Sequence, residues 1–237
     1  MNKHFITVEN NEKVSAVHHK SDSDRWIFFC HGFGSDKEGS YERRCSKAVE
    51  NGWNAVRFDF RGNNESDGEF IDQGLSSRIK DLESVIDHFD PEKCVLFGMS
   101  FGGKVVFHHA IEDKRVRAVI GKSPVTYNEI MDKFRSVIEQ KGEYTHFDDK
   151  TIDKRFIKDL DKYSFEKVTE LLDIPTAFYH GRADSTVHSE NTWKAAEDLE
   201  CDTYVEMFEG EKHKMSEEAD IKILESMFHW LKRTHNF

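Results

Sequence analysis

A serine inside a glycine-rich pentapeptide is the residue of this sequence best placed to do chemistry. Gly98-Met99-Ser100-Phe101-Gly102 has the pattern G-x-S-x-G, follows the apolar run KCVLF and precedes a helix predicted over about 101–112. A serine on a sharp turn between strand and helix exposes its hydroxyl at the carboxyl edge of a sheet. We therefore predict that Ser100 is a nucleophile. A glycine-rich turn with only a structural role is the alternative.

A serine hydroxyl needs a base, and the base needs a carboxylate to orient it. Asp184 follows the strand-like run PTAFYH, and His213 follows the last predicted strand, in the chain order Ser, Asp, His. We predict that Ser100, Asp184 and His213 form a catalytic triad. An aspartate that caps a helix and a solvated loop histidine are the alternatives. His180 and His188 are rival bases, but neither follows the last strand.

Acyl transfer also needs donors for a tetrahedral oxyanion. We predict the backbone N–H of Phe101, beside the positive end of a helix, and that of Phe33, in the loop His31-Gly32-Phe33-Gly34. Small residues in such a loop let the backbone approach a substrate closely. A turn with no catalytic role is the alternative. The residues that we expect to line the substrate are His31, Gly32, Gly34 and Met99.

Strands alternate with helices along the chain. An opening hairpin is predicted around Asn10-Asn11. The predicted strands are 4–9, 13–19, 25–30, 53–60, 93–97, 116–120, 175–180 and 203–208. The predicted helices are 40–51, 76–89, 101–112, 189–200 and 216–234, with Ser76 or Ser77 as a cap of the second. The alternation indicates an α/β fold with a mostly parallel central sheet and helices on both faces.

One segment, 122–172, interrupts this alternation and holds no clear strand. It reads as two or three helices, over about 126–141, 149–161 and 164–172. A stretch this long is unusual in a compact domain unless it is folded or functional. We predict a helical lid inserted into a core made of 1–121 and 173–237. An extra helical layer with no substrate role is the alternative. Its seven aromatic residues favour flat or apolar acyl groups: Tyr127, Phe134, Tyr144, Phe147, Phe156, Tyr163 and Phe165.

The composition excludes several kinds of partner. The formal net charge is −11 and the pI about 5.6, which argues against nucleic acid and anionic membrane surfaces as partners. No stretch approaches the ~20 apolar residues of a membrane helix. The first residues lack the apolar run of a secretion signal, and the four cysteines form no CxxC pair. We therefore expect a cytoplasmic protein. The oligomeric state stays open, a homodimer included.

Thirteen histidines raise the question of a metal. The pairs His18-His19 and His108-His109 are sequence neighbours, so their side chains point to different faces of a strand or helix. Neither pair has the i,i+4 spacing of a helical zinc site. We predict no metal and no cofactor.

Five motifs together resemble the α/β-hydrolase family: HGFGSD, FDFRGNNESDG, GMSFGG, HGRADSTV and GEKH, in that order. They are most similar to small lidded carboxylesterases, such as bacterial cinnamoyl and feruloyl esterases, within a group that includes monoacylglycerol lipases and serine aminopeptidase-like hydrolases. The resemblance covers about residues 20–235 and is weakest over 122–172. It implies a catalytic triad of Ser100, Asp184 and His213, and an oxyanion hole formed at Phe33 and Phe101. It also implies that Asp59-Phe60-Arg61-Gly62 shapes a loop near the site. Family members often have glycine where this chain has Asn64.

The expected activity is that of a serine carboxylesterase, acting by two-step acyl transfer on a small ester with a short or aromatic acyl group. A thioesterase, a monoacylglycerol lipase-like enzyme and a peptidase remain open, because the motifs report the nucleophile and not the leaving group. The high charge of 122–172 counts against a lipase. A non-catalytic binding protein is a further alternative, while serine at the elbow disfavours a dehalogenase.

Overall fold

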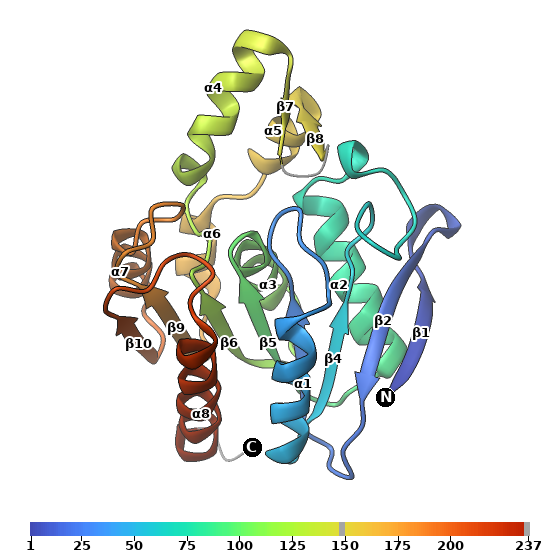
Figure 1. The fold of residues 1–237 in the computed structure, drawn as a ribbon, viewed down its shortest axis with the longest axis vertical. Helices are drawn as coiled ribbons and strands as arrows, with labels where there is room; N and C mark the ends of the chain where they lie inside the picture. The colour runs from blue at the N-terminus through green and yellow to red at the C-terminus, as the bar shows by residue number, and fades with distance from the viewer. Residues whose placement is uncertain (147–149, 235–237) are drawn as a thin grey trace.

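An eight-stranded sheet forms the centre of the computed structural model, which describes residues 1–146 and 150–234 (Figure 1). Its strand order is β1-β2-β4-β3-β5-β6-β9-β10. β1 pairs antiparallel with β2, and β2 with β4, whereas every later pair is parallel. The strands are β1 (Asn2–Thr7), β2 (Lys13–His19), β3 (Trp26–Cys30), β4 (Asn54–Phe58), β5 (Cys94–Met99), β6 (Val116–Lys122), β9 (Thr176–Gly181) and β10 (Thr203–Phe208). The predicted opening hairpin and mostly parallel sheet are confirmed.

Helices cover both faces of this sheet (Figure 1). One face packs against α1 (Ser40–Glu50) and α8 (Glu217–Thr234). The other packs against α2 (Leu75–Phe89), α3 (Phe101–Ala110), α6 (Phe165–Leu171) and α7 (Glu190–Asp198). Because helices lie on both sides, the central strands are buried on both faces and read as continuous apolar runs. This is the α/β-hydrolase arrangement that the motifs predict.

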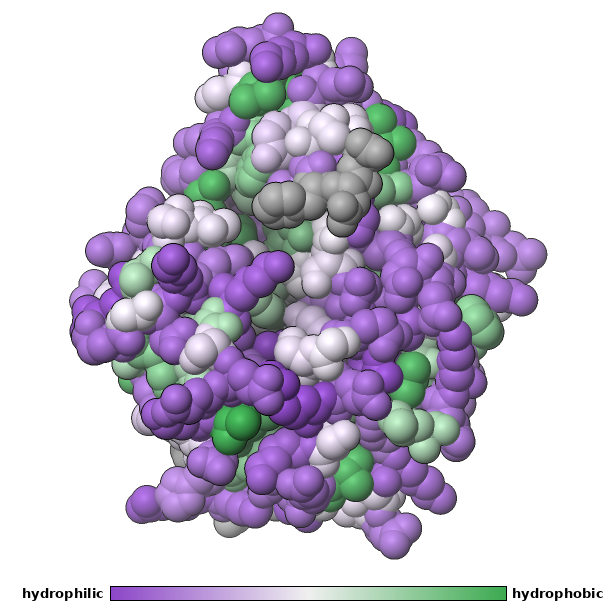
Figure 2. All heavy atoms as spheres, viewed as in Figure 1, coloured by the Kyte–Doolittle hydropathy of each residue, from purple (hydrophilic) through white to green (hydrophobic). Residues whose placement is uncertain are grey.

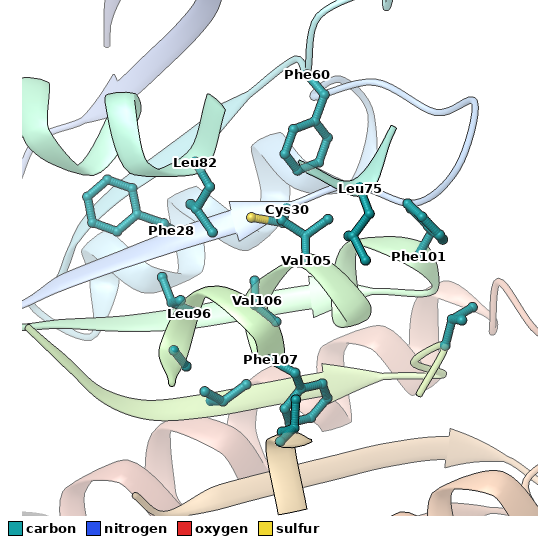
Figure 3. Packing of buried hydrophobic residues seen from close by; sticks show 14 of the residues in the cluster. Phe28, Cys30, Phe60, Leu75, Leu82, Leu96, Phe101, Val105, Val106 and Phe107 are labelled. Atoms are coloured by element: carbon teal, nitrogen blue, oxygen red, sulfur yellow. The ribbon is translucent and has the colours of Figure 1, made fainter. Parts of the chain in front are cut away.

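The core on the α2 and α3 side packs around the strand that leads to the serine turn. Figure 3 shows Leu96 of β5 beside Val106 of α3, with Leu82 and Leu75 of α2 on the same side of the cluster. Leu96, Val106 and Leu82 have no exposed surface. Close packing of this kind transmits small volume changes to neighbouring residues. The turn after β5 is therefore held by a rigid layer on this side.

The segment between β6 and β9 rises above the carboxyl edge of the sheet (Figure 1). Its elements are η3 (Asn128–Met131), α4 (Asp132–Lys141), β7 (Glu143–Thr145), β8 (Thr151–Asp153), α5 (Lys154–Leu160) and then α6. The expectation that it holds no strand is wrong, because β7 and β8 pair antiparallel. Strands of three residues show too little alternation to be detected in a sequence. Gly142, with φ +87°, ends α4 at the point where the hairpin begins.

Two predicted helix starts also differ from the structure. α5 begins at Lys154 rather than near 149, because the side chain of Asp153 accepts a hydrogen bond from the N–H of Arg155 and caps the helix. α2 is not capped by its own serines. The Ser76 N–H donates instead to Asp159 Oδ2, 2.8 Å away on α5, so the inserted segment 122–172 supplies the acceptor.

The surface is mainly polar on the face drawn in Figure 2, where apolar residues occur in small separate patches. Among residues 1–146 and 150–234, no helix has the length and apolar character needed to cross a membrane.

Candidate active site

Ser100 lies on a strained turn between β5 and α3. Its backbone has φ 53° and ψ −122°, in a region that L-residues rarely occupy. The turn is held by hydrogen bonds: the Ser100 N–H donates to the carbonyl of Lys122 over 3.0 Å, and the Ser100 carbonyl accepts from Gly103 and Val125. Strain of this kind persists only where the surroundings enforce it, and it is common at functional sites.

The glycines beside Ser100 are required by close backbone packing. A Cβ on Gly98 would lie 2.4 Å from the carbonyl oxygen of Gly102. A Cβ on Gly102 would lie 2.5 Å from the carbonyl oxygens of both Cys30 and His31. These distances are shorter than any side chain tolerates. Gly98 therefore lets the strand approach the start of α3, and Gly102 lets the serine turn approach the end of β3, where the predicted oxyanion loop begins.

Three side chains predicted as a triad lie in one hydrogen-bonded chain. Ser100 Oγ is 3.0 Å from His213 Nε2. His213 Nδ1 is 2.7 Å from Asp184 Oδ2, and because a carboxylate only accepts, the Nδ1–H must be the donor. His213 Nε2 is then free of hydrogen and able to accept the proton of the Ser100 hydroxyl. The arrangement can activate a serine for attack on a carbonyl carbon.

Asp184 is buried in a shell of donors. Its Oδ1 accepts the backbone N–H groups of Thr186 and Val187 over 2.8 and 3.0 Å, and its Oδ2 accepts His213 and His180. Burial by itself would raise the pKa of Asp184. The hydrogen bonds from His180 and His213 outweigh burial and hold the pKa of this carboxyl well below its usual range. Asp184 is therefore ionised at neutral pH.

His180, considered from the sequence as a rival base, contacts Asp184 and not Ser100. Its side chain is fully buried. Its Nε2 lies 2.9 Å from the carbonyl of Val187 and 3.1 Å from Asp184 Oδ2, and both of these oxygens only accept, so Nε2 carries the hydrogen. Its Nδ1 accepts the hydroxyl of Thr192 over 2.7 Å. His180 is thus a histidine that orients the carboxylate. The spacing of four residues between His180 and Asp184 is the sequence signal that could have indicated this contact.

The loops that carry Asp184 and His213 are joined by backbone contacts. β9 and β10 are parallel neighbours, and the Ala183 N–H donates to the carbonyl of Glu211 over 2.9 Å. A Cβ on Gly181 would lie 2.3 Å from that same carbonyl oxygen. Only glycine at 181 allows this approach. The contact brings the acid and the base within hydrogen-bonding distance.

A buried lysine holds the His213 loop from below. Lys122 has no exposed surface, its Nζ donates to the carbonyl of Lys214 over 3.0 Å, and it pairs with Asp220 Oδ1 at 3.1 Å. Arg44 pairs with the same carboxylate at 2.7 Å. This cluster ties the residue after His213 to the first turn of α8. Nothing in the sequence pattern indicated it.

The predicted oxyanion loop lies against Ser100. A Cβ on Gly32 would be 3.1 Å from Ser100 Cβ and 3.7 Å from Ser100 Oγ. Phe33 follows Gly32 directly, so its backbone is carried to the same place. Phe101 is the first residue of α3, where a backbone N–H has no partner within the helix. The two predicted donors are thus carried by chain segments next to Ser100: Phe101 follows it directly, and Phe33 follows Gly32.

The four predicted substrate-lining residues differ in position. Met99 is partly exposed, and Gly32 faces Ser100. Gly34, with φ +66°, faces the lid segment, since its Cβ would meet His146 at 3.2 Å. His31 does not fit the prediction. Its ring is buried, Nδ1 donates to the Gly32 carbonyl, and Nε2 accepts the N–H of Phe60, so its side chain is closed to a substrate.

The Phe33 side chain connects the predicted oxyanion loop to the inserted segment 122–172. Its ring centroid lies 5.6 Å from that of Phe156, 6.2 Å from that of Phe134 and 5.4 Å from that of His146. Lys150 Nζ also donates to the Gly34 carbonyl over 2.6 Å. The inserted segment 122–172 therefore contacts the loop beside Ser100 directly.

The other aromatic residues of 122–172 serve different contacts. Tyr127 stacks edge-on against Phe165, which packs on Phe107 of α3, so these rings belong to the core. Tyr163 packs on His108. Tyr144 contacts the Phe134 ring at 4.6 Å. Phe147 lies outside the described residues. Only a part of the predicted aromatic set thus lies near the oxyanion loop.

The loop with Asn64 adopts a glycine-like conformation despite the asparagine. Asn64 has φ +46°, which asparagine tolerates better than most residues, and its Nδ2 donates to Asp59 Oδ2. The same carboxylate accepts Lys37 Nζ over 2.7 Å, and Lys37 is fully buried. The chain thus keeps the loop's conformation and adds a hydrogen bond that glycine could not make.

Within the part of the chain that the structure describes, no group of three or more His, Cys, Asp or Glu side chains could hold a metal ion.

A mostly parallel sheet with a strained serine turn after β5, and an aspartate and a histidine after β9 and β10, is the architecture of an α/β-hydrolase. The sequence matches the prolyl oligopeptidase family, Peptidase_S9, over residues 42–237. The chain therefore belongs to this family of α/β-hydrolases.

Known proteins similar to the chain include esterases and thioesterases. The human mitochondrial palmitoyl-protein thioesterase ABHD10 is 27% identical over 183 residues, which are 71% of this chain and 60% of that protein. The chain thus spans less than two thirds of that relative's length. The structure of mouse α/β-hydrolase domain-containing protein 10 superposes with a TM-score of 0.87 at 20% identity, covering 98% of this chain and 99% of that one. Est1E from Butyrivibrio proteoclasticus with bound ferulic acid has a TM-score of 0.87 at 17% identity, over 99% and 100%. At these identities the two superpositions show the shared fold.

Proposed function

We propose that this protein is a serine hydrolase that cleaves carboxylic esters through an acyl-enzyme on Ser100. The observation that carries the proposal is the hydrogen-bonded chain from Ser100 Oγ through His213 to Asp184, at 3.0 and 2.7 Å. A buried, ionised carboxylate, a correctly oriented imidazole and a strained serine are together costly to maintain in a protein without such a reaction.

In the proposed reaction, His213 Nε2 takes the proton of Ser100 as Oγ attacks the carbonyl carbon of the ester. Asp184 holds the imidazole orientation and stabilises its positive charge. The N–H groups of Phe33 and Phe101 bind the oxyanion. The imidazolium then gives its proton to the departing alcohol. Water, deprotonated by His213 in its turn, attacks the acyl-enzyme and releases the acid.

The lid segment supports an apolar acyl group as part of the substrate. Phe33, Phe134 and Phe156 form a group of aromatic rings next to the proposed hole. We propose that 122–172 covers the acyl group, with a short or aromatic acyl chain preferred. The ferulic acid bound to Est1E, which has a similar fold, is an aromatic acid of the kind that such a group of rings would accept.

A thioester substrate is the second candidate. Several of the relatives that match in sequence are named palmitoyl-protein thioesterases, whereas the match to the esterase Est1E is one of fold alone. The triad does not select between esters and thioesters, because the alcohol of an ester and the thiol of a thioester both leave from the carbonyl carbon that Ser100 attacks. Peptide bonds belong to the same test, since the family name refers to oligopeptides.

The test is a substrate panel measured on wild type, Ser100→Ala and the control Ser46→Ala, whose hydroxyl lies on the exposed face of α1. The panel holds p-nitrophenyl esters from acetate to palmitate, methyl ferulate, an S-palmitoyl peptide and an aminoacyl anilide. We expect ester hydrolysis that Ser100→Ala lowers by at least about 10³-fold and Ser46→Ala leaves unchanged. Activity that survives in Ser100→Ala would refute the nucleophile, and thioester turnover that exceeds ester turnover would favour the second candidate.

We also propose that the protein works in the cytoplasm, supported by its four free cysteines. Fractionation of cells followed by fluorophosphonate labelling would test this, and a labelled band confined to an organelle would contradict it.

A further inference from the structure

Arg78 of α2 is a buried cation surrounded by aromatic rings. The residue is 1% exposed. The guanidinium carbon lies 5.3 Å from the ring centroid of Phe70, 5.4 Å from that of Phe60, and 5.9 Å from those of Phe33 and Phe101. Figure 3 shows Phe60 and Phe101 at the same end of the core cluster, near Leu75 at the start of α2. The rings are the immediate surroundings of the charge.

No carboxylate neutralises this guanidinium by direct contact within the described residues. Arg78 Nε and Nη2 are buried without a hydrogen-bond partner in residues 1–146 and 150–234. The nearby acid is Asp81, one turn further along α2, but its carboxylate accepts the N–H and the Nε–H of Arg61 over 2.9 and 2.6 Å. Burial lowers the pKa of Arg78 to about 10, with Asp81 acting in the opposite direction. Arg78 therefore stays charged at neutral pH.

This arrangement costs stability. A buried guanidinium with two nitrogens that lack hydrogen bonds loses hydration there, and the rings return only a part of that free energy. Two other buried arginines are built differently: Arg44 pairs with Asp220, and Arg61 with Asp81. An apolar side chain of similar length at 78 would fit four phenylalanine rings at lower cost. The charge at this position thus needs a reason other than stability.

The position of the rings supplies that reason. Phe33 and Phe101, two of the four rings, belong to the two residues proposed as oxyanion donors, one next to Gly32 and the other next to Ser100 in the chain. We propose that Arg78 is a positioning residue of the oxyanion hole: it fixes the Phe33 and Phe101 side chains together, and its uncompensated positive charge favours the oxyanion. This inference rests on the proposed function. Because the guanidinium is buried, its charge is weakly screened, so it acts over a longer distance than a charge on the surface.

The experiment compares Arg78→Met, Arg78→Lys and the control Arg115→Met with wild type. Methionine keeps the length without the charge, and lysine keeps the charge without the planar group. Arg115 precedes β6, at the sheet edge opposite to Ser100, and pairs with Asp87 and Asp113. Each protein is assayed for kcat and KM on the best ester of the panel, and for its melting temperature.

We expect Arg78→Met to lower kcat about 10-fold or more, to change KM less than about 2-fold and to melt at the wild-type temperature or above. Arg78→Lys should recover part of the kcat, and Arg115→Met should keep all of it. If Arg78 had only a structural role, Arg78→Met would melt at a lower temperature than wild type. The kcat of Arg78→Lys would then be no higher than that of Arg78→Met.

Two results would overturn the inference while leaving the proposed function intact. One is a folded Arg78→Met with wild-type kcat. The other is a kcat and a melting temperature that fall in Arg78→Lys by as much as they fall in Arg78→Met. An Arg78→Met that fails to fold would also overturn it, since the charge would then be structural. A wild type that hydrolyses nothing in the panel and is not labelled by a fluorophosphonate would overturn both.

Discussion

His180 is the residue at which the proposed mechanism can be tested away from the triad itself. We expect His180→Phe to lower kcat while KM stays close to wild type. Phenylalanine keeps a planar aromatic ring and is somewhat larger than histidine, so the buried site next to Asp184 stays filled. It removes the Nε2–H that Asp184 Oδ2 accepts at 3.1 Å and the Nδ1 that accepts the Thr192 hydroxyl at 2.7 Å.

The size of the effect follows from these two contacts. A hydrogen bond to a charged acceptor contributes about 1.5–3 kcal/mol, and Asp184 Oδ2 would be left with His213 alone. The loss is felt most when the imidazole becomes positive, which happens in the transition state. Since about 1.4 kcal/mol is tenfold in rate, we expect kcat to fall roughly 10- to 100-fold. The unpaired hydroxyl of Thr192 and carbonyl of Val187 should lower the free energy of unfolding by about 1–3 kcal/mol.

The assay is steady-state hydrolysis of the best ester of the panel, combined with urea unfolding. His180→Gln is a partial rescue because its amide keeps a donor, and we expect its kcat to lie between those of His180→Phe and wild type. His229→Phe, on the exposed face of α8, is the matched control. A folded His180→Phe with wild-type kcat, or one that changes KM alone, would refute the orienting role of His180.

Two further predictions concern the serine turn and the pH dependence of stability. Gly102→Ala should lower kcat by about 10²-fold and the free energy of unfolding by about 1–3 kcal/mol, because its Cβ would lie 2.5 Å from two backbone carbonyls; unchanged kinetics would contradict the packing. His108 is buried, and burial first, then Lys104, lowers its pKa to about 3. The unfolded chain, with a histidine pKa near 6.5, binds the proton first as pH falls, so stability decreases from pH 6.5 towards 3. Urea unfolding at pH 8 and pH 5 measures how much the free energy of unfolding falls between these pH values. We expect this fall to be about 2 kcal/mol smaller in His108→Phe than in wild type. An equal fall in both proteins would refute the role of His108.

That Ser100, Asp184 and His213 lie together could be predicted because each of the three residues follows the end of a strand. Ser100, Asp184 and His213 come after apolar runs, and the carboxyl ends of parallel strands meet at one edge of a sheet. The opening hairpin and the alternation of strands and helices follow from the same local patterns of periodicity and turn residues. Most strand and helix boundaries of the core agree with prediction to within a few residues for the same reason.

Contacts between segments far apart in the chain were decided by the tertiary structure alone. The sequence shows His180 as a possible base, but only packing against Val187 and Asp184 makes it an orienting group. Arg78 is one polar residue of an amphipathic helix until the fold places it among rings from the oxyanion loop and from α3. The lid hairpin is too short to carry a periodic signal, and it forms because β7 and β8 pair with each other. Periodicity reports which face of an element is buried, whereas the identity of the neighbour on that face depends on how the whole chain closes.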